Sequence, residues 1–228
     1  MSVPERQPKK AKAWGAPAIS EPRWPASLAI LAACAISYYL PAQYTLGPQW
    51  LFPAIALAIL VPLSVVAPHR VASESRAVQA AALGLIGVLM FSNIVSLGRL
   101  IHVLVFVPKS VVGATLLASA AGIWLTNVLV FALWYWELDR GGPDERLETG
   151  HSAPDFLFPQ MSTPGCAAPG WAPAFLDYLY IAFTNATAFS PTDTLPLSRW
   201  AKVLMLIQST ASLLTVSLVA ARAVNILT

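Results

Sequence analysis

Hydroxyl, amide and carboxylate side chains follow one another closely between positions 184 and 193. Oxygen atoms of these kinds can bind a cation, and a carboxylate repeated around an oligomer axis would select cations over anions. The same side chains can instead cap a short helix and satisfy an irregular buried backbone. Both interpretations stay open for this set, which comprises Thr184, Asn185, Thr187, Ser190, Thr192 and Asp193.

A second set of polar side chains interrupts long apolar runs. The last run carries four of them at offsets of 0, 4, 7 and 14, namely Gln208, Ser212, Thr215 and Arg222. These offsets place them on one face of a helix, which must contact protein or a water-filled cavity. Asn127 lies in an earlier run. Arg99 and His102 either form a substrate or proton site or lie at the interface with their charged ends toward headgroups.

Enzyme chemistry is not indicated by the sequence. The three histidines are scattered without metal-ligand spacing, and there is no nucleophile motif or glycine-rich phosphate loop. We therefore predict no catalytic residues, no metal site and no cofactor. The acidic stretch 137–155 resembles a solvated loop, since it lacks the glycine and the ligand order of a calcium-binding loop.

Composition identifies the elements that must position these residues. The 228-residue chain is 57% hydrophobic and 11% charged, whereas soluble domains have roughly 25% charged residues. Long apolar blocks with charges between them predict an all-α, polytopic membrane helix bundle. About five transmembrane helices are expected, at 24–40, 50–67, 78–107, 111–136 and 200–227. The segment 175–190 is short and polar in its second half, so it either re-enters the membrane or crosses it as a sixth helix.

Domain organisation follows from the same pattern. We expect a disordered basic tail at 1–23 and a four-helix transmembrane region at 24–136. An acidic and proline-rich loop at 137–173 and a carboxy-terminal unit at 174–228 follow. The basic tail favours a cytoplasmic amino terminus in contact with anionic headgroups, and no basic fold suggests a nucleic-acid partner. Five spans place the carboxy terminus outside, whereas six place both termini inside.

Residues 183–196, FTNATAFSPTDTLP, resemble the pore helix and filter of two-helix potassium channels. Thr187 matches the threonine at the end of the pore helix, and Asp193 and Pro196 match the residues that follow the filter. The helix after it resembles the inner helix of those channels. The resemblance covers about 50 of the 228 residues. It implies a pore module in a homo-oligomer, tetrameric by analogy.

The filter itself departs from that family. Ala188 stands at the filter threonine, Ser190 and Thr192 at the two glycines, and Pro191 at the tyrosine. Because proline fixes its φ angle and glycine permits backbone angles that other residues resist, a potassium-selective carbonyl ladder is not expected. The complete pore-like set is Thr184, Asn185, Thr187, Ala188, Phe189, Ser190, Pro191, Thr192 and Asp193.

The whole chain resembles a group of uncharacterised bacterial multi-pass membrane proteins. That resemblance implies the bacterial plasma membrane and no established activity. The leading hypothesis is channel-like permeation of monovalent cations with weak preference. The alternatives are a transporter of small solutes or ions and a non-conducting membrane scaffold.

Overall fold

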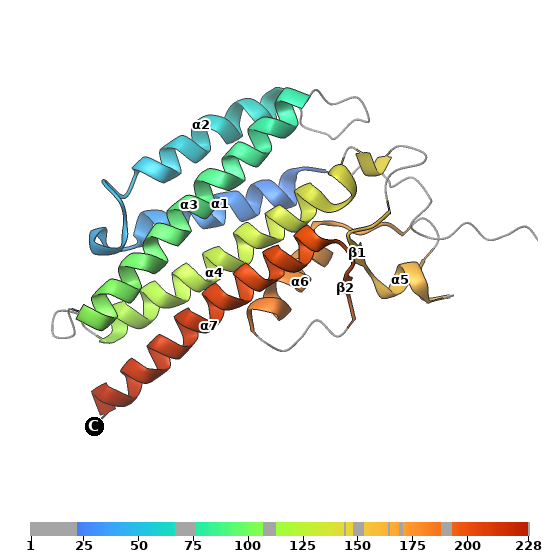
Figure 1. The fold of residues 1–228 in the computed structure, drawn as a ribbon. Coiled ribbons are helices and arrows are strands. Elements are labelled where there is room, and N and C mark those ends of the chain that lie inside the picture. The colour runs from blue at the N-terminus through green and yellow to red at the C-terminus, as the bar shows by residue number, and fades with distance from the viewer. Residues whose placement is uncertain are drawn as a thin grey trace, which may run out of the picture.

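The chain is an all-α helix bundle in the computed structural model, which describes residues 22–66, 76–106, 113–143, 145–147, 153–163, 165–168, 171–187 and 193–227 (Figure 1). Five helices form its body: α1 (Trp24–Tyr39), α2 (Leu51–Val66), α3 (Arg76–Phe106), α4 (Gly113–Leu138) and α7 (Arg199–Leu227). Their bounds lie within a few residues of the five apolar runs in the sequence.

Short elements connect and cover these helices. The 3₁₀ turn η2 (Ala42–Tyr44) follows α1, and η3 (Asp139–Gly141) and η4 (Glu145–Leu147) follow α4. The two-residue strand β1 (Phe156–Leu157) pairs antiparallel with β2 (Leu195–Pro196). Two further helices, α5 (Pro159–Ser162) and α6 (Phe175–Ala186), lie between the strands in the chain.

Three helices are long and apolar enough to cross a membrane, namely α3, α4 and α7. The other two, α1 and α2, are shorter apolar helices of 16 residues each. At about 1.5 Å per residue they measure about 24 Å, which is slightly less than a hydrocarbon core of roughly 30 Å. Large apolar side chains are exposed on the outer faces of the helices, including Val65, Ile94 and Leu206. The bundle is therefore a polytopic membrane fold in a lipid environment.

The helices alternate in direction between two ends of the bundle. Residues from the start of α1, the end of α2, the start of α3 and the end of α4 line one cavity, so these four helix ends lie together. We call this the Asp139 end. The opposite end, which we call the Tyr44 end, packs η2 against the end of α3 and the start of α4. The helix α7 runs from the Asp139 end to the Tyr44 end, antiparallel to α4 (Figure 1).

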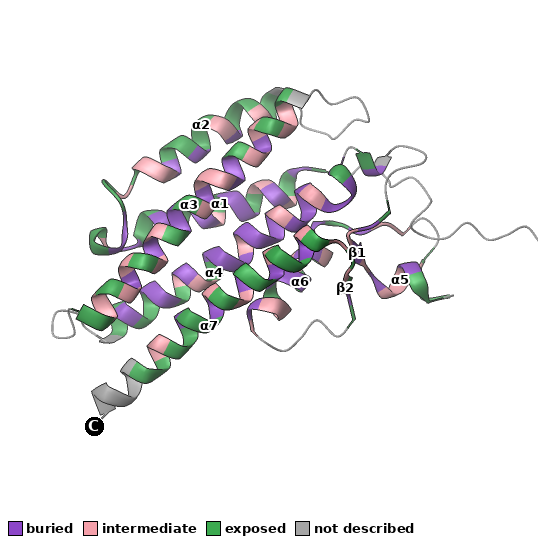
Figure 2. Ribbon diagram, in the orientation of Figure 1, coloured by how far each residue is buried: buried purple, intermediate pink, exposed green. Residues whose placement is uncertain are grey.

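The helix α4 is the centre of the bundle and α7 is peripheral. In the most apolar stretch of each helix, 67% of the α4 residues are buried within the protein, against 17% for α7. Buried residues accordingly extend along α4, while α7 has a largely exposed outer side (Figure 2). The helix α4 packs against α1, α3, α6 and α7. Side chains that these helices turn toward the interior therefore contact α4.

Candidate functional site

The carboxylate of Asp139, just beyond the end of α4, is surrounded by donors. Its Oδ1 accepts the backbone N–H groups of Asp155 and Phe156 at 2.8 and 3.3 Å. Its Oδ2 accepts the Tyr178 hydroxyl at 2.6 Å and Nε of Arg140 at 3.0 Å. Asp139 has no exposed surface. One buried carboxylate therefore ties the end of α4 to both β1 and α6.

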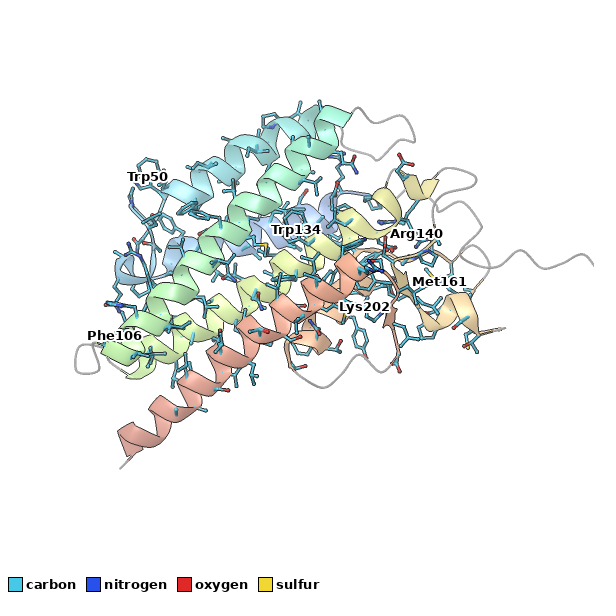
Figure 3. All side chains as sticks on the ribbon, in the orientation of Figure 1. Trp50, Phe106, Trp134, Arg140, Met161 and Lys202 are labelled. Atoms are coloured by element: carbon cyan, nitrogen blue, oxygen red, sulfur yellow. The ribbon has the colours of Figure 1, made fainter. Side chains whose placement is uncertain are left out.

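Asp155 extends this connection to the start of α7. Its Oδ2 accepts the Arg140 backbone N–H and its Oδ1 accepts Nε1 of Trp200, both at 2.9 Å. The backbone N–H of Leu197 donates to the Asp155 carbonyl at 2.7 Å, and β1 pairs with β2 beside it. We refer to these joined residues as the Asp139 cluster: Asp139, Arg140, Arg146, Asp155, Tyr178 and Trp200. Arg140 lies beside the end of α4 and the start of α7 (Figure 3).

Arg146 completes the cluster by covering the end of α4. Its Nη1 donates to the carbonyls of Trp136 and Asp139 at 2.9 and 3.0 Å. The Asp139 carbonyl also accepts the Gly142 backbone N–H at 3.0 Å. The Arg146 guanidinium lies 5.3 Å from the centre of the Tyr178 ring. Burial raises the pKa of Tyr178 well above its ordinary value. The phenol therefore stays neutral and can donate to Asp139.

These contacts overturn the expectation of a solvated loop after α4. Asp139, Arg140 and Arg146 are at most 3% exposed. Opposite charges and backbone donors within the same stretch compensate for the loss of water, which makes burial of the carboxylates and guanidiniums tolerable. The sequence shows six carboxylates and two arginines between 137 and 155. It does not show which of them meet.

The segment 175–196 begins and ends at the Asp139 end. Tyr178 in the first turn of α6 bonds to Asp139, and β2 pairs with β1 next to Asp155. The helix α6 has 12 residues, or about 18 Å of length. Near its end, Nδ2 of Asn185 donates to the Met205 carbonyl at 2.9 Å, within the second turn of α7. The helix thus reaches partway along α7 before the chain returns.

The pore-like residues have separate surroundings where they are described. The Thr184 hydroxyl donates to the Tyr180 carbonyl at 2.9 Å, and the Thr187 hydroxyl donates to the Phe183 carbonyl at 3.1 Å, so both bond to their own helix. Asn185 bonds to α7. Asp193 is exposed. The remaining predicted positions, Ala188, Phe189, Ser190, Pro191 and Thr192, lie outside the described residues.

Gln208 is the central contact of the polar face of α7. Its Oε1 accepts the Tyr135 hydroxyl at 2.6 Å and Nδ2 of Asn185 at 2.8 Å. Its Nε2 donates to the Ala182 carbonyl at 2.8 Å. The side chain has no exposed surface. One amide therefore joins α4, α6 and α7 with its hydrogen bonds satisfied on both sides.

The other polar residues of α7 also lie against protein. Nδ2 of Asn127 donates to the Ser212 hydroxyl at 2.9 Å, and the Thr215 hydroxyl donates to the Ala211 carbonyl at 2.8 Å. All three of Asn127, Ser212 and Thr215 are buried. The side chain of Arg222 is outside the described part.

Arg99 and His102 lie away from these contacts. The helix α3 continues to Phe106, so both residues are helical and near the Tyr44 end. Arg99 is half-buried, and His102 is exposed with its ring centre 5.2 Å from that of Phe106. The structure brings neither of them into the Asp139 cluster or to Gln208.

Buried polar residues form a layer across the bundle that sequence reasoning only partly identified. The apolar core consists of two clusters, one toward each end. Along α1, α3, α4 and α7, buried polar residues separate the residues of the first apolar cluster from those of the second. We call these nine buried residues the polar layer: Ser37, Ser92, Asn93, Ser96, Thr126, Asn127, Gln208, Ser212 and Thr215.

No protein-family model, curated protein or solved structure matches this chain. The chemistry of the site therefore has to be argued from its own residues. Among the described residues, no group of three or more His, Cys, Asp or Glu side chains could hold a metal ion.

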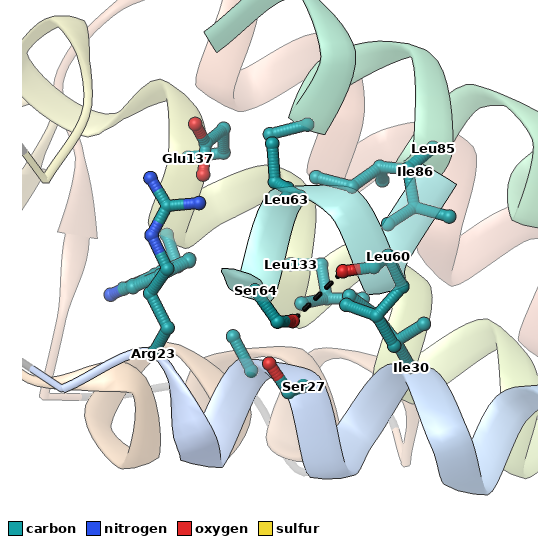
Figure 4. Close-up of a pocket in the computed structure, with 13 residues that line it drawn as sticks. Arg23, Ser27, Ile30, Leu60, Leu63, Ser64, Leu85, Ile86, Leu133 and Glu137 are labelled. Atoms are coloured by element: carbon teal, nitrogen blue, oxygen red, sulfur yellow. Dashed lines mark hydrogen bonds between the residues drawn. The ribbon is translucent and has the colours of Figure 1, made fainter. Parts of the chain in front are cut away.

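A small apolar cavity of about 30 Å³ lies between α1, α2, α3 and α4 at the Asp139 end, with room for about one water molecule. Arg23 and Glu137 are buried at its mouth, and the guanidinium points toward the carboxylate (Figure 4). Its other walls include Ile30, Leu60 and Leu85. This cavity is too small for an organic substrate. A second, open pocket of about 450 Å³ lies at the Tyr44 end, between the end of α1 and the start of α4.

Proposed function

We propose that the chain is an oligomeric, channel-like membrane protein in which the segment 175–196 re-enters the membrane and admits monovalent cations with weak preference. The observation that carries the proposal is the common anchoring of both ends of this segment at the Asp139 end. A segment that leaves and returns on one side of a membrane has this arrangement.

The length of α6 supports re-entry over crossing. Its roughly 18 Å falls well short of a hydrocarbon core of about 30 Å. Asn185, near its end, is level with Met205, within the second turn of α7. Re-entrant segments in general contain non-helical backbone at membrane depth, which is tolerated where protein or water surrounds it.

The outer face of α6 supports assembly of several copies. Tyr180 is 53% exposed and Phe183 is 47% exposed, and Thr184 lies on the same side of the helix. The adjacent α7 also has a largely exposed outer side. A single hairpin encloses no path, so conduction requires copies that face one another across these surfaces. The resemblance to potassium channels suggests four.

Asp193 supports the preference for cations. It is exposed in the returning limb, two residues before β2. Repeated around a symmetry axis, its carboxylate would form an acidic ring near the mouth of the path. Because serine, threonine and proline occupy the filter positions, we expect weak selectivity among monovalent cations.

The test is cation flux from liposomes that contain the purified protein. We expect a potassium and sodium leak that Asp193→Asn reduces several-fold and that Glu145→Gln leaves unchanged. Glu145 is an exposed carboxylate at the same end of the bundle but outside the segment, so it controls for a general loss of charge. Protein-containing liposomes as tight as empty ones would contradict the proposal.

Orientation is a separate part of the proposal. The basic tail suggests that the Asp139 end faces the cytoplasm of a bacterial plasma membrane. Single cysteines introduced at Ala153 and at Asn225, in a background without Cys34 and Cys166, test this with a membrane-impermeant thiol reagent. We expect labelling from opposite sides, with residue 225 accessible from outside. Labelling of both positions from one side would rule out the five-span arrangement.

The polar layer favours a transporter as the second candidate, because it lies inside one copy of the chain. A transporter needs no ring of copies, so the mass of the protein in detergent separates the two classes. A monomer excludes the channel proposal. A tetramer supports it.

A further inference from the structure

The open pocket at the Tyr44 end is a groove between the end of α1 and the start of α4. Its volume of about 450 Å³ lies within the roughly 300–1,000 Å³ of pockets that hold small molecules. One wall comprises Ile36, Tyr39, Leu40 and Pro41, and α4 supplies the other wall. We call it the α1–α4 groove.

Small residues of α4 form the floor of the groove. Ala114, Ala118 and Gly122 recur every four residues and therefore lie along one side of the helix. At Gly122 the two helices are in close contact, since an added Cβ would lie 3.0 Å from Cγ2 of Ile36. From this contact α1 continues for one turn to Leu40, whereas the antiparallel α4 continues for two turns to Ala114. The start of α4 therefore extends beyond α1 by about 6 Å.

The groove is continuous with the lipid-facing surface of the bundle. Tyr39 on its rim is 81% exposed, and Leu117, beside the α4 wall, is 50% exposed. The 26 residues of α4 measure about 39 Å, which exceeds a hydrocarbon core of roughly 30 Å, so its first turns lie at the edge of this core. Tyrosine is typical of that depth. The acyl chains of phospholipids begin there, next to the groove.

The chemistry of the lining identifies the class of ligand. None of the eight described residues that line the groove is charged, so an ion bound there would lack a counter-charge. The Ser119 hydroxyl is buried and donates to the Thr115 carbonyl at 2.7 Å, so it is already bonded within α4. Ile36, Leu40 and Ala118 present apolar atoms. An apolar chain fits these walls, whereas a polar solute would lose hydrogen bonds on entry.

We propose that the α1–α4 groove binds one acyl chain of a membrane phospholipid. The chain gains van der Waals contacts with two fixed helix walls. The site is independent of the channel proposal, since it requires neither several copies nor the segment 175–196. The rival occupants are a second copy of the chain and residues 107–112, which precede α4 in the sequence.

Ala118→Leu tests the site by filling the groove. Ala118 is exposed, so leucine at this position requires no rearrangement of the core. The full chain in detergent is mixed with palmitoyl-oleoyl-phosphatidylcholine, and native mass spectrometry counts the lipid that each chain retains. We expect one retained lipid per unmodified chain and a several-fold lower retained fraction for Ala118→Leu.

Ala121→Leu is the matched control. Ala121 is an exposed alanine of the same helix but is not among the residues that line the groove. This variant should retain lipid as the unmodified chain does. Equal retention by the two variants, or no retained lipid in any of the three proteins, would overturn the proposal. A dimer that only Ala118→Leu disrupts, with no retained lipid, would overturn it in favour of a second copy.

Photolabelling of the unmodified protein is a second test that needs no variant. The probe is phosphatidylcholine with a diazirine in the middle of one acyl chain, added to the protein in detergent. Labelling of 36–41 and 114–119 should fall when excess unlabelled lipid competes. Labelling of the exposed α7 stretch 203–207 should fall much less, because this surface has no groove among those found in the described part of the chain. Equal competition at the two surfaces would mean that the groove holds lipid no better than the rest of the bundle, which contradicts the proposal.

Discussion

The Tyr178 hydroxyl donates to Oδ2 of Asp139 at 2.6 Å, and this bond joins the first turn of α6 to the end of α4. Both residues have no exposed surface. The same carboxylate holds the backbone of Asp155, whose own side chain holds Trp200 at the start of α7. The start of α6 and the start of α7 are therefore fixed relative to each other through one pair of carboxylates.

Tyr178→Phe should destabilise the protein by about 1–3 kcal/mol, because it removes a donor from a buried charged acceptor. The thermal unfolding midpoint in detergent measures the effect. Tyr180→Phe is the control, since Tyr180 is two residues away and 53% exposed. Equal midpoints for the two variants would mean that the bond to Asp139 does not hold α6 in place.

Alkaline pH should weaken the folded state through the same phenol. Burial raises the pKa of Tyr178 in the folded protein above its value in the unfolded chain, which is about 10. The folded state thus holds this proton more tightly, so its contribution to stability is complete below pH about 10 and is lost as the pH rises beyond it. Unfolding midpoints measured from pH 8 upward should fall more steeply for the unmodified protein than for Tyr178→Phe.

Gly142→Ala should destabilise the Asp139 end, because Gly142 has a φ angle of 113° and an added Cβ would lie 3.0 Å from the Glu137 carbonyl oxygen. Strain of this kind costs roughly 1–3 kcal/mol. Gly84→Ala is the control, since an added Cβ there meets no atom within 4 Å. Alanine at this helical position should be neutral or stabilising by up to about 1 kcal/mol. Chemical denaturation curves of both variants, fitted in parallel, give the comparison.

The helices were predictable from the sequence because a membrane span is a property of a local stretch. Apolar length defined α3 to within a few residues, and the spacing of Gln208, Ser212 and Thr215 predicted that they share a face. The Asp139 cluster was not predictable, because its bonds join residues up to 45 positions apart. The composition of the stretch after α4 is that of a solvated loop, and only tertiary contacts show that Asp139, Arg140 and Arg146 are buried.

The sequence predicted only part of the polar layer, because spacing within one helix is a local pattern and the packing of one helix on another is not. A stripe at helical spacing in α7 is visible in the sequence, and Ser92, Ser96 and Arg99 of α3 follow a helical spacing as well. Serine and threonine are common in apolar helices, so their positions alone indicate nothing about a site. The pairing of two antiparallel helices brings them to one level.

The Asn127–Ser212 hydrogen bond should contribute little on its own despite its burial. Bonds between transmembrane helices average about 0.6 kcal/mol in double-mutant cycles, with a maximum near 1.7, because the separated helices find other partners in the membrane. A cycle of Asn127→Ala, Ser212→Ala and the double variant should therefore give a coupling energy within this range. Gln208→Leu should cost more than either single variant, because Tyr135, Asn185 and Ala182 all lose a partner at once. Steric-trapping measurements in bicelles can resolve these differences, and a coupling energy near zero would show that the polar face of α7 specifies helix positions without stabilising them.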